Sequence, residues 1–163
     1  MRIYILRHGI AEGRRTGLDD AKRALTEDGK AKLRQVLDRA AAAKVTPSVI
    51  LTSPYLRAEQ TARMAAEVLG RKTVVQTEAL LPGSSPENVW REIRAHAKKS
   101  SLLLAGHEPL LSETASWLLG AGGTIIDLKK GAMLSIAVDT LKKPQRGVLE
   151  WLLTPKLAAP GAQ

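Results

Sequence analysis

The chain has 163 residues, of which 44% are hydrophobic and 25% charged, and this balance predicts one soluble globular domain with no apolar run long enough to span a bilayer. It contains no cysteine, which excludes disulfides and thiolate chemistry, and it opens on a strand rather than a signal peptide, so we expect a cytoplasmic location. The net charge of +9 is scattered and aromatic residues are only 3%, which disfavours nucleic acid and membrane partners and favours an anionic substrate.

The first quarter of the chain reads as a strand, an irregular segment and a helix. Residues 2–6 are mostly apolar and predict the first strand. Residues 10–25 are polar and contain glycines, so they predict an irregular connection. Thr26 is a suitable N-cap for a helix that runs to about Lys44, because the apolar residues that follow it keep the helical period.

Two strand–helix units follow. Residues 49–52 predict a strand, and Ser53-Pro54 predicts a helix start with a serine cap and proline in the first turn. Gly70 is expected to end that helix. Residues 73–76 predict a third strand, and Ser85-Pro86 predicts another capped helix start.

The rest of the chain predicts three strands and one helix. Residues 101–105 are apolar without alternation, as expected of a strand covered on both faces. A helix is predicted at residues 110–119. Residues 133–138 and 148–153 predict an antiparallel hairpin, and residues 155–163 are expected to be a frayed tail.

This alternation of strands and helices predicts an α/β fold class, with a single three-layer α/β/α domain over residues 1–154. The central sheet should be mostly parallel, with an antiparallel hairpin at its C-terminal end. Polar candidates stand where the predicted strands end, and they are, in order, Arg7-His8, Ser53 with Arg57, Glu78, and His107. Because parallel strands end at one edge of a sheet, these side chains should converge there.

The converging groups suit a phosphoryl ligand. Guanidinium groups match phosphate oxygens in bidentate geometry, and a helix N-terminus adds backbone donors. One neutral imidazole can attack phosphorus, and a second imidazole, if protonated, can stabilise the transition state. A metal site is poorly supported, because the three histidines lack short ligand spacing and His96 lies on a helix away from the strand ends.

Three segments carry a resemblance to a known family: Arg7-His8-Gly9, the run SPYLRAEQTA at residues 53–62, and Gly106-His107. Together they resemble the histidine phosphatase superfamily, also called phosphoglycerate-mutase-like, and look most like its bacterial phosphohistidine phosphatase (SixA) group. The resemblance extends from residue 2 to about residue 154. It implies the phosphoglycerate-mutase-like fold, without the helical lid that larger relatives insert, because this chain has no room for one.

The resemblance also implies roles for particular residues. His8 would be the nucleophile that becomes phosphorylated, while Arg7, Arg57 and His107 would bind the transferred phosphoryl group. Arg23 stands where this small group tends to carry a basic residue near the site. For the general acid, Glu78 is the nearest match to the glutamate of larger relatives. The alternatives for the general acid are Asp20, Glu108, or no acid at all. Asp20 is also a candidate for substrate binding.

We therefore expect a metal-independent phosphatase without cofactor that removes phosphate from histidine on a partner protein through a phospho-His8 intermediate. The partner could be a histidine phosphotransfer domain, and the chain itself is expected to be a monomer. The alternatives are a small-molecule phosphomonoesterase that acts on a sugar phosphate, and a non-catalytic phosphate-recognition module.

Overall fold

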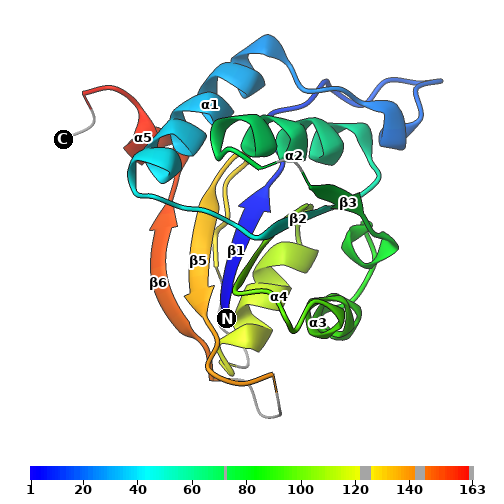
Figure 1. Ribbon diagram of the computed structural model, residues 1–163. Coiled ribbons are helices and arrows are strands. Elements are labelled where there is room, and N and C mark those ends of the chain that lie inside the picture. The colour runs from blue at the N-terminus through cyan, green and yellow to red at the C-terminus, as the bar shows by residue number, and fades with distance from the viewer. Residues whose placement is uncertain (72, 122–125, 142–145, 162–163) are drawn as a thin grey trace.

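A single six-stranded sheet forms the centre of the protein. The computed structural model describes residues 1–71, 73–121, 126–141 and 146–161 (Figure 1). The strands lie in the order β3-β2-β4-β1-β5-β6. Their bounds are β1 (Arg2–Arg7), β2 (Val49–Thr52), β3 (Val74–Gln76), β4 (Ser101–Gly106), β5 (Met133–Ala137) and β6 (Val148–Leu153).

Four strands of the sheet are parallel and two are antiparallel. β1 pairs with β4, β4 with β2, and β2 with β3, all in parallel. β5 runs antiparallel to β1, and β6 runs antiparallel to β5. All six residues of β4 are buried, which explains why its sequence lacks alternation. The predicted fold class, a mostly parallel sheet with a C-terminal antiparallel hairpin, is confirmed.

Helices cover both faces of this sheet (Figure 1). Successive residues of β1 alternate between two cores, because side chains of a strand point to opposite faces. Ile3 and Ile5 pack with α3 (Pro86–Ala95) and α4 (Leu110–Leu118). Tyr4 and Leu6 pack with α1 (Glu27–Ala42), α2 (Leu56–Val68) and the short α5 (Pro155–Ala158). The result is three layers.

Two local expectations were wrong. α2 begins at Leu56 with Tyr55 as its N-cap, two residues later than predicted, because the Ser53 hydroxyl has other partners. The second wrong expectation is a frayed tail from residue 155, because residues 155–158 form α5. Thr154 caps this helix by accepting a hydrogen bond from the N–H of Leu157, and Ala158 is buried against the core that contains α1. The cap at Thr26 is confirmed, since its side chain accepts a hydrogen bond from the N–H of Gly29.

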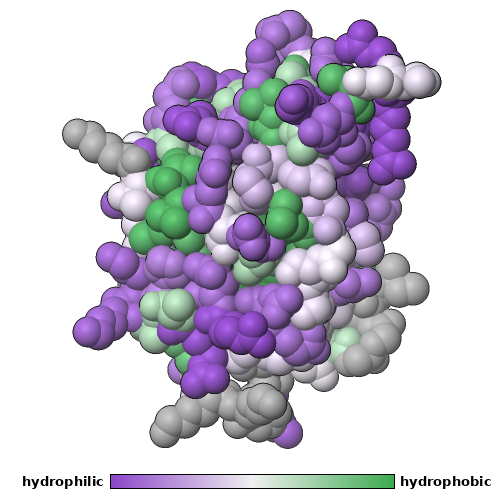
Figure 2. Space-filling model, turned by 90° about the vertical axis from the view of Figure 1, so that its right-hand side faces the viewer, coloured by the Kyte–Doolittle hydropathy of each residue, from purple (hydrophilic) through white to green (hydrophobic). Residues whose placement is uncertain are grey.

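The connections at the carboxyl edge of the sheet carry only short helical turns. Residues 8–26 include η1 (Asp20–Lys22), and residues 77–85 include η2 (Glu78–Leu80). Within the described parts of the chain, no helix is long and apolar enough to cross a membrane. Seen from the side that carries β3 and α3, the surface is largely hydrophilic, with hydrophobic side chains in a few separate places (Figure 2).

The first turn of α1 packs directly on the segment that follows β1. A Cβ atom at Gly29 would lie less than 3.0 Å from the backbone nitrogen, carbon and oxygen of Ile10. A Cβ atom at Gly9 would lie 3.3 Å from the Gly29 carbonyl oxygen. Glycine at position 29 allows this close approach of α1 to the chain two residues after His8, and glycine at position 9 avoids a further tight contact.

We predict that Gly29→Ala lowers the free energy of unfolding by about 2 kcal/mol, because backbone must move to accept the methyl group. Gly13→Ala is the control, since a Cβ atom there meets nothing within 4 Å, and it should change stability by less than about 0.5 kcal/mol. Urea unfolding of the three proteins measures both effects. Equal stability of Gly29→Ala and the wild type would contradict the close packing.

Candidate active site

The register of three parallel strands brings His8, Ser53 and His107 together. Arg7 of β1 stands opposite Gly106 of β4, and Thr52 of β2 stands opposite Ala105 of β4. Each of the three residues is the first after its strand. The backbone N–H of His8 donates to Gly106 O at 3.1 Å, and that of Ser53 donates to Ala105 O at 3.0 Å. As a result, the ring centroids of His8 and His107 lie 5.1 Å apart.

The His8 ring is held in one tautomer. Its Nδ1 lies 2.7 Å from Gly9 O, and because a carbonyl can only accept, Nδ1 carries the hydrogen. Nε2 therefore has a lone pair, and it accepts a hydrogen bond of 3.3 Å from Arg57 Nε. Gly9 is fixed in turn, because its N–H donates to Thr61 Oγ1 on α2. The atom that could attack a ligand is Nε2.

Burial keeps the His8 ring neutral. The side chain is only 7% exposed, and this burial lowers the pKa of His8 to about 4. The hydrogen bond to the Gly9 carbonyl opposes the shift, while the positive charges of Arg57, Arg7 and Lys130 add to it. A neutral imidazole at neutral pH is the form that can act as a nucleophile.

Arg57, in the first turn of α2, joins His8 to the irregular segment after β1. It is 4% exposed, and besides His8 it binds Asp20 twice, with Nη1 on the backbone oxygen at 2.6 Å and Nη2 on Oδ2 at 2.9 Å. Arg23 Nε donates to the other carboxylate oxygen of Asp20 at 2.9 Å. Burial alone would raise the pKa of Asp20, but the bonds and charges of Arg57 and Arg23 outweigh it and lower the pKa. Asp20 is thus an ionised anchor for both guanidiniums.

His107 is buried beside His8 and has one nitrogen unused. Its Nε2 forms a hydrogen bond of 2.9 Å with Ser53 Oγ, and the centroids of the His107 and Tyr55 rings lie 5.3 Å apart in an edge-on arrangement. Burial, followed by the His8 and Arg57 charges, lowers the pKa of His107 to about 3. In the tautomer in which Ser53 donates to Nε2, the ring hydrogen sits on Nδ1. Nδ1 is buried and has no partner within the described part of the chain.

Arg7 supplies a second unused donor. Its Nη1 donates to Leu128 O at 2.7 Å, but its Nε is buried without a partner among the residues described. Buried polar atoms are normally hydrogen-bonded, so a missing partner calls for an explanation. Arg7 directly precedes His8 at the end of β1, and His107 follows the neighbouring strand β4. The unused nitrogens of these two residues suggest an anionic ligand next to His8.

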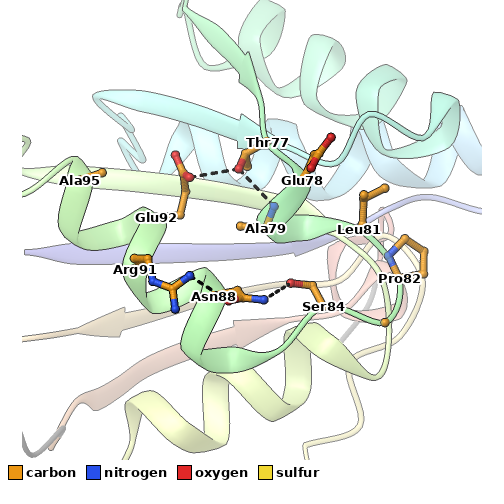
Figure 3. A pocket seen from close by; sticks show the side chains of 11 residues that line it. Thr77, Glu78, Ala79, Leu81, Pro82, Ser84, Asn88, Arg91, Glu92 and Ala95 are labelled. Carbon is orange, nitrogen blue, oxygen red and sulfur yellow. Dashed lines mark hydrogen bonds between the residues drawn. The ribbon is translucent and has the colours of Figure 1, made fainter.

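The two other candidates for the general acid, Glu78 and Glu108, do not share the position of Asp20 between Arg23 and Arg57. Glu78 is exposed on η2, where it lines a cleft of about 730 Å³ between η2 and α3, and its side chain points away from α3 (Figure 3). No hydrogen bond or ion pair connects Glu78 to His8, Arg57 or His107. Glu108, directly after His107, is half-buried and accepts bonds from Ser112 N at 3.2 Å and Ser112 Oγ at 2.5 Å. Burial raises the pKa of Glu108.

Ser53 lies at the carboxyl edge of the sheet as the sequence predicted, but its hydroxyl binds His107 instead of capping a helix. The structure adds two residues, Tyr55 and Thr61, whose part in the site the sequence did not show. Tyr55 contacts His107 and has the Arg57 guanidinium 5.0 Å above its ring. Thr61 bonds to Gly9 N–H and to Arg57 O. Thr61 stands four residues after Arg57, one helical turn away, which is the only sequence signal that could have linked them.

Comparisons with known proteins relate the whole chain to one family. The family model described as histidine phosphatase superfamily (branch 1) matches residues 3–81. An uncharacterized protein of Picosynechococcus sp. is 34% identical over 139 residues, which cover 83% of this chain and 84% of the relative. Phosphohistidine phosphatase SixA of Escherichia coli is 26% identical over 161 residues, covering 95% and 94%.

Solved structures show the same likeness. The protein histidine phosphatase SixA complexed with tungstate superposes with a TM-score of 0.83 at 25% identity, covering 95% of this chain and 97% of that one. A phosphoserine phosphatase of Entamoeba histolytica, in complex with 3-phosphoglyceric acid, shares the fold with a TM-score of 0.66 at 17% identity, covering 93% and 95%. The chain belongs to the histidine phosphatase superfamily, which supports its assignment as a phosphatase. Within that family it falls in the SixA-like group.

We predict that His8 and His107 stay neutral down to about pH 5, where an ordinary histidine with a pKa of 6.5 is already charged. Because the unfolded chain binds protons near pH 6.5 and the folded one does not, stability should fall as the pH drops from 6.5 towards 4. Titration of the ring ¹⁵N shifts by NMR measures the first effect, and urea unfolding at each pH measures the second. A His8 midpoint near 6.5 would contradict the account.

Proposed function

We propose that this protein removes the phosphoryl group from phosphohistidine on a partner protein through a covalent phospho-His8 intermediate. One observation carries the proposal. His8 offers a neutral Nε2 lone pair, with Nδ1 bound to Gly9 O, at a place where Arg57 and His107 are buried around it. A nucleophile among cations and donors is what transfer of a dianionic phosphoryl group requires.

The reaction divides into two displacements at phosphorus. In the first, His8 Nε2 forms a bond to phosphorus while the bond from phosphorus to the substrate imidazole breaks, and that imidazole leaves and takes up a proton from solvent. In the second, water attacks phosphorus and releases a proton to solvent, the bond to Nε2 breaks, and inorganic phosphate departs. The Arg57 Nε–H, which donates to Nε2 in the free enzyme, turns to a phosphoryl oxygen when Nε2 attacks.

The second imidazole acts differently from the cation that the sequence suggested. Burial and nearby charges hold His107 neutral in the ligand-free protein. A phosphoryl dianion next to the ring would raise its pKa, because opposite charge favours the protonated form. His107 therefore takes its proton when the substrate binds, or donates its one N–H to a phosphoryl oxygen. Either form stabilises negative charge in the transition state.

The ionisation and hydrogen bonding of the three candidate carboxylates favour a substrate whose leaving group departs without a strong general acid. Asp20 is ionised and bound to two guanidiniums, and Glu78 is exposed. Glu108 has a raised pKa, but its carboxylate is occupied by Ser112 at the start of α4. Imidazole departs with a pKa near ~6.5, whereas a sugar alkoxide needs a strong acid. Phosphohistidine suits a site without a dedicated acid better than a sugar phosphate does.

We also propose that catalysis needs no metal ion. No group of three histidine or acidic side chains in the described segments could hold one. The positive charge that Mg²⁺ supplies in other phosphoryl-transfer enzymes would come from Arg7 and Arg57. Assays run in the presence of a chelator should therefore keep full activity, and activity restored only by a divalent ion would refute the claim.

We predict that His8→Ala reduces turnover at least about 1000-fold, since no other group can form the intermediate. His96→Ala is the matched control, because His96 pairs with Glu92 on α3 and takes no part in the site. Rapid quench with ³²P-labelled phosphohistidine protein should trap an acid-labile, alkali-stable phosphoenzyme at His8. Full activity of His8→Ala would remove the covalent mechanism, and binding without turnover in the wild type would identify a recognition module.

We predict that kcat/KM for a phosphorylated histidine phosphotransfer domain exceeds that for sugar phosphates at least about tenfold, or ~1.4 kcal/mol. The described segments 8–26 and 77–85 carry only short helical turns over the carboxyl edge, so few side chains would enclose a small ester while a protruding phosphohistidine can enter. Steady-state kinetics on both substrate classes decide the matter. A sugar phosphate that outperforms every phosphohistidine protein would establish the small-molecule alternative.

A further inference from the structure

A tight turn carries Lys130 to the active-site edge. The N–H of Ala132 donates to Lys129 O at 2.8 Å, which closes a β-turn over residues 129–132. Gly131, at its third position, has a φ of +76°, a conformation that glycine adopts without strain. This turn, called the Lys130 turn below, has Lys130 at its second position.

The Lys130 turn is bonded to the end of β1. The N–H of Gly131 donates both to Arg7 O at 3.2 Å and to His8 O at 3.0 Å. In return, the Arg7 N–H donates to Ala132 O at 3.0 Å, and Arg7 Nη1 donates to Leu128 O at 2.7 Å. Backbone hydrogen bonds on both sides of Lys130 thus set its position relative to the nucleophile. The backbone of Lys130 therefore has a fixed place at the site's edge.

The two lysines of this turn differ in their partners. Lys129 forms an ion pair with Asp127 Oδ2 at 2.5 Å. Lys130 is exposed, and no carboxylate in the described ranges lies within ion-pair distance of its ammonium group. Its charge nevertheless reaches the site, because it is one of the three cations that help burial to lower the pKa of His8. Lys130 therefore combines a backbone next to His8 with an ammonium group that has no ion-pair partner in the described ranges, and this charge is available to an anionic ligand.

We propose that Lys130 is a further substrate-binding residue, whose ammonium contacts a phosphoryl oxygen on the solvent side of the site. The inference rests on the proposed phosphoryl site at His8. Arg7, Arg57 and His107 hold the ligand from the buried side, while Lys130 reaches it from the exposed rim. A lysine suits this position, because its compact charge on a flexible stem can follow phosphate in and out.

Isothermal titration with tungstate, used as a phosphate mimic, tests this contact without any turnover. We expect Lys130→Ala to weaken tungstate binding about tenfold, or ~1.4 kcal/mol, and Lys130→Arg to retain most of the affinity. Lys129→Ala is the matched control from the same turn and should bind like the wild type. KM for a phosphohistidine protein should rise in Lys130→Ala by a similar factor, with kcat changed less.

An unchanged tungstate affinity in Lys130→Ala would overturn the inference, even if turnover of a phosphoprotein fell. An equal loss in Lys129→Ala would also overturn it, since a general loss of surface charge would then explain the effect. The proposed function fails by a different result, namely a wild type that binds tungstate but hydrolyses no phosphohistidine. In that case the comparison of the lysine variants still decides the role of Lys130.

Discussion

The site depends on the pairing of three parallel strands, β1, β4 and β2, because this pairing makes them end side by side at one edge of the sheet. Pairing of β1 with β4 and of β4 with β2 ends each strand at the same edge, so His8, Ser53 and His107 become neighbours without any long loop. A slip of one residue in either pairing would turn these side chains to the other face of the sheet. The buried cores on both faces oppose such a slip, because Ile3 and Ile5 belong to one core and Tyr4 and Leu6 to the other. The stability of the sheet and the geometry of the site therefore have the same origin.

Charge balance is the second constraint. Three guanidiniums, of Arg14, Arg23 and Arg57, lie within ion-pair distance of a single carboxylate, Asp20. Arg57 is buried, and a buried charge without a partner is strongly destabilising, so Asp20 makes this arrangement possible in the free protein. One negative charge leaves the cluster positive, and the charge of Arg57 adds to the burial that lowers the pKa of His8. A phosphoryl dianion would supply the missing negative charge, and it would find the unused donors of Arg7 and His107 already in place.

The sequence predicted those features that depend on local pattern. Strand runs, the Thr26 cap and the polar residues at strand ends were enough to place His8, Arg57 and His107 at one edge. The start of α2 was misplaced because the Ser53 hydroxyl binds His107, a partner 54 residues away. The pairing of Asp20 with Arg57 and the bonds between the Lys130 turn and His8 also join distant segments. The hydrophobic periodicity of a sequence does not predict such contacts, because they depend on how the helices and the sheet pack in the folded protein. Lys130 therefore looked like one more scattered basic residue.

A crystal structure with bound vanadate would test the central claim most directly, since vanadate adopts the geometry of phosphorus during displacement. The account predicts vanadium bonded to His8 Nε2, with Arg7, Arg57 and His107 donating to its oxygens. It also predicts that His8 Nδ1 keeps its hydrogen bond to Gly9 O. Vanadate bound to Nδ1, or bound elsewhere with His8 Nε2 still paired to Arg57, would contradict the assignment of His8 as the nucleophile.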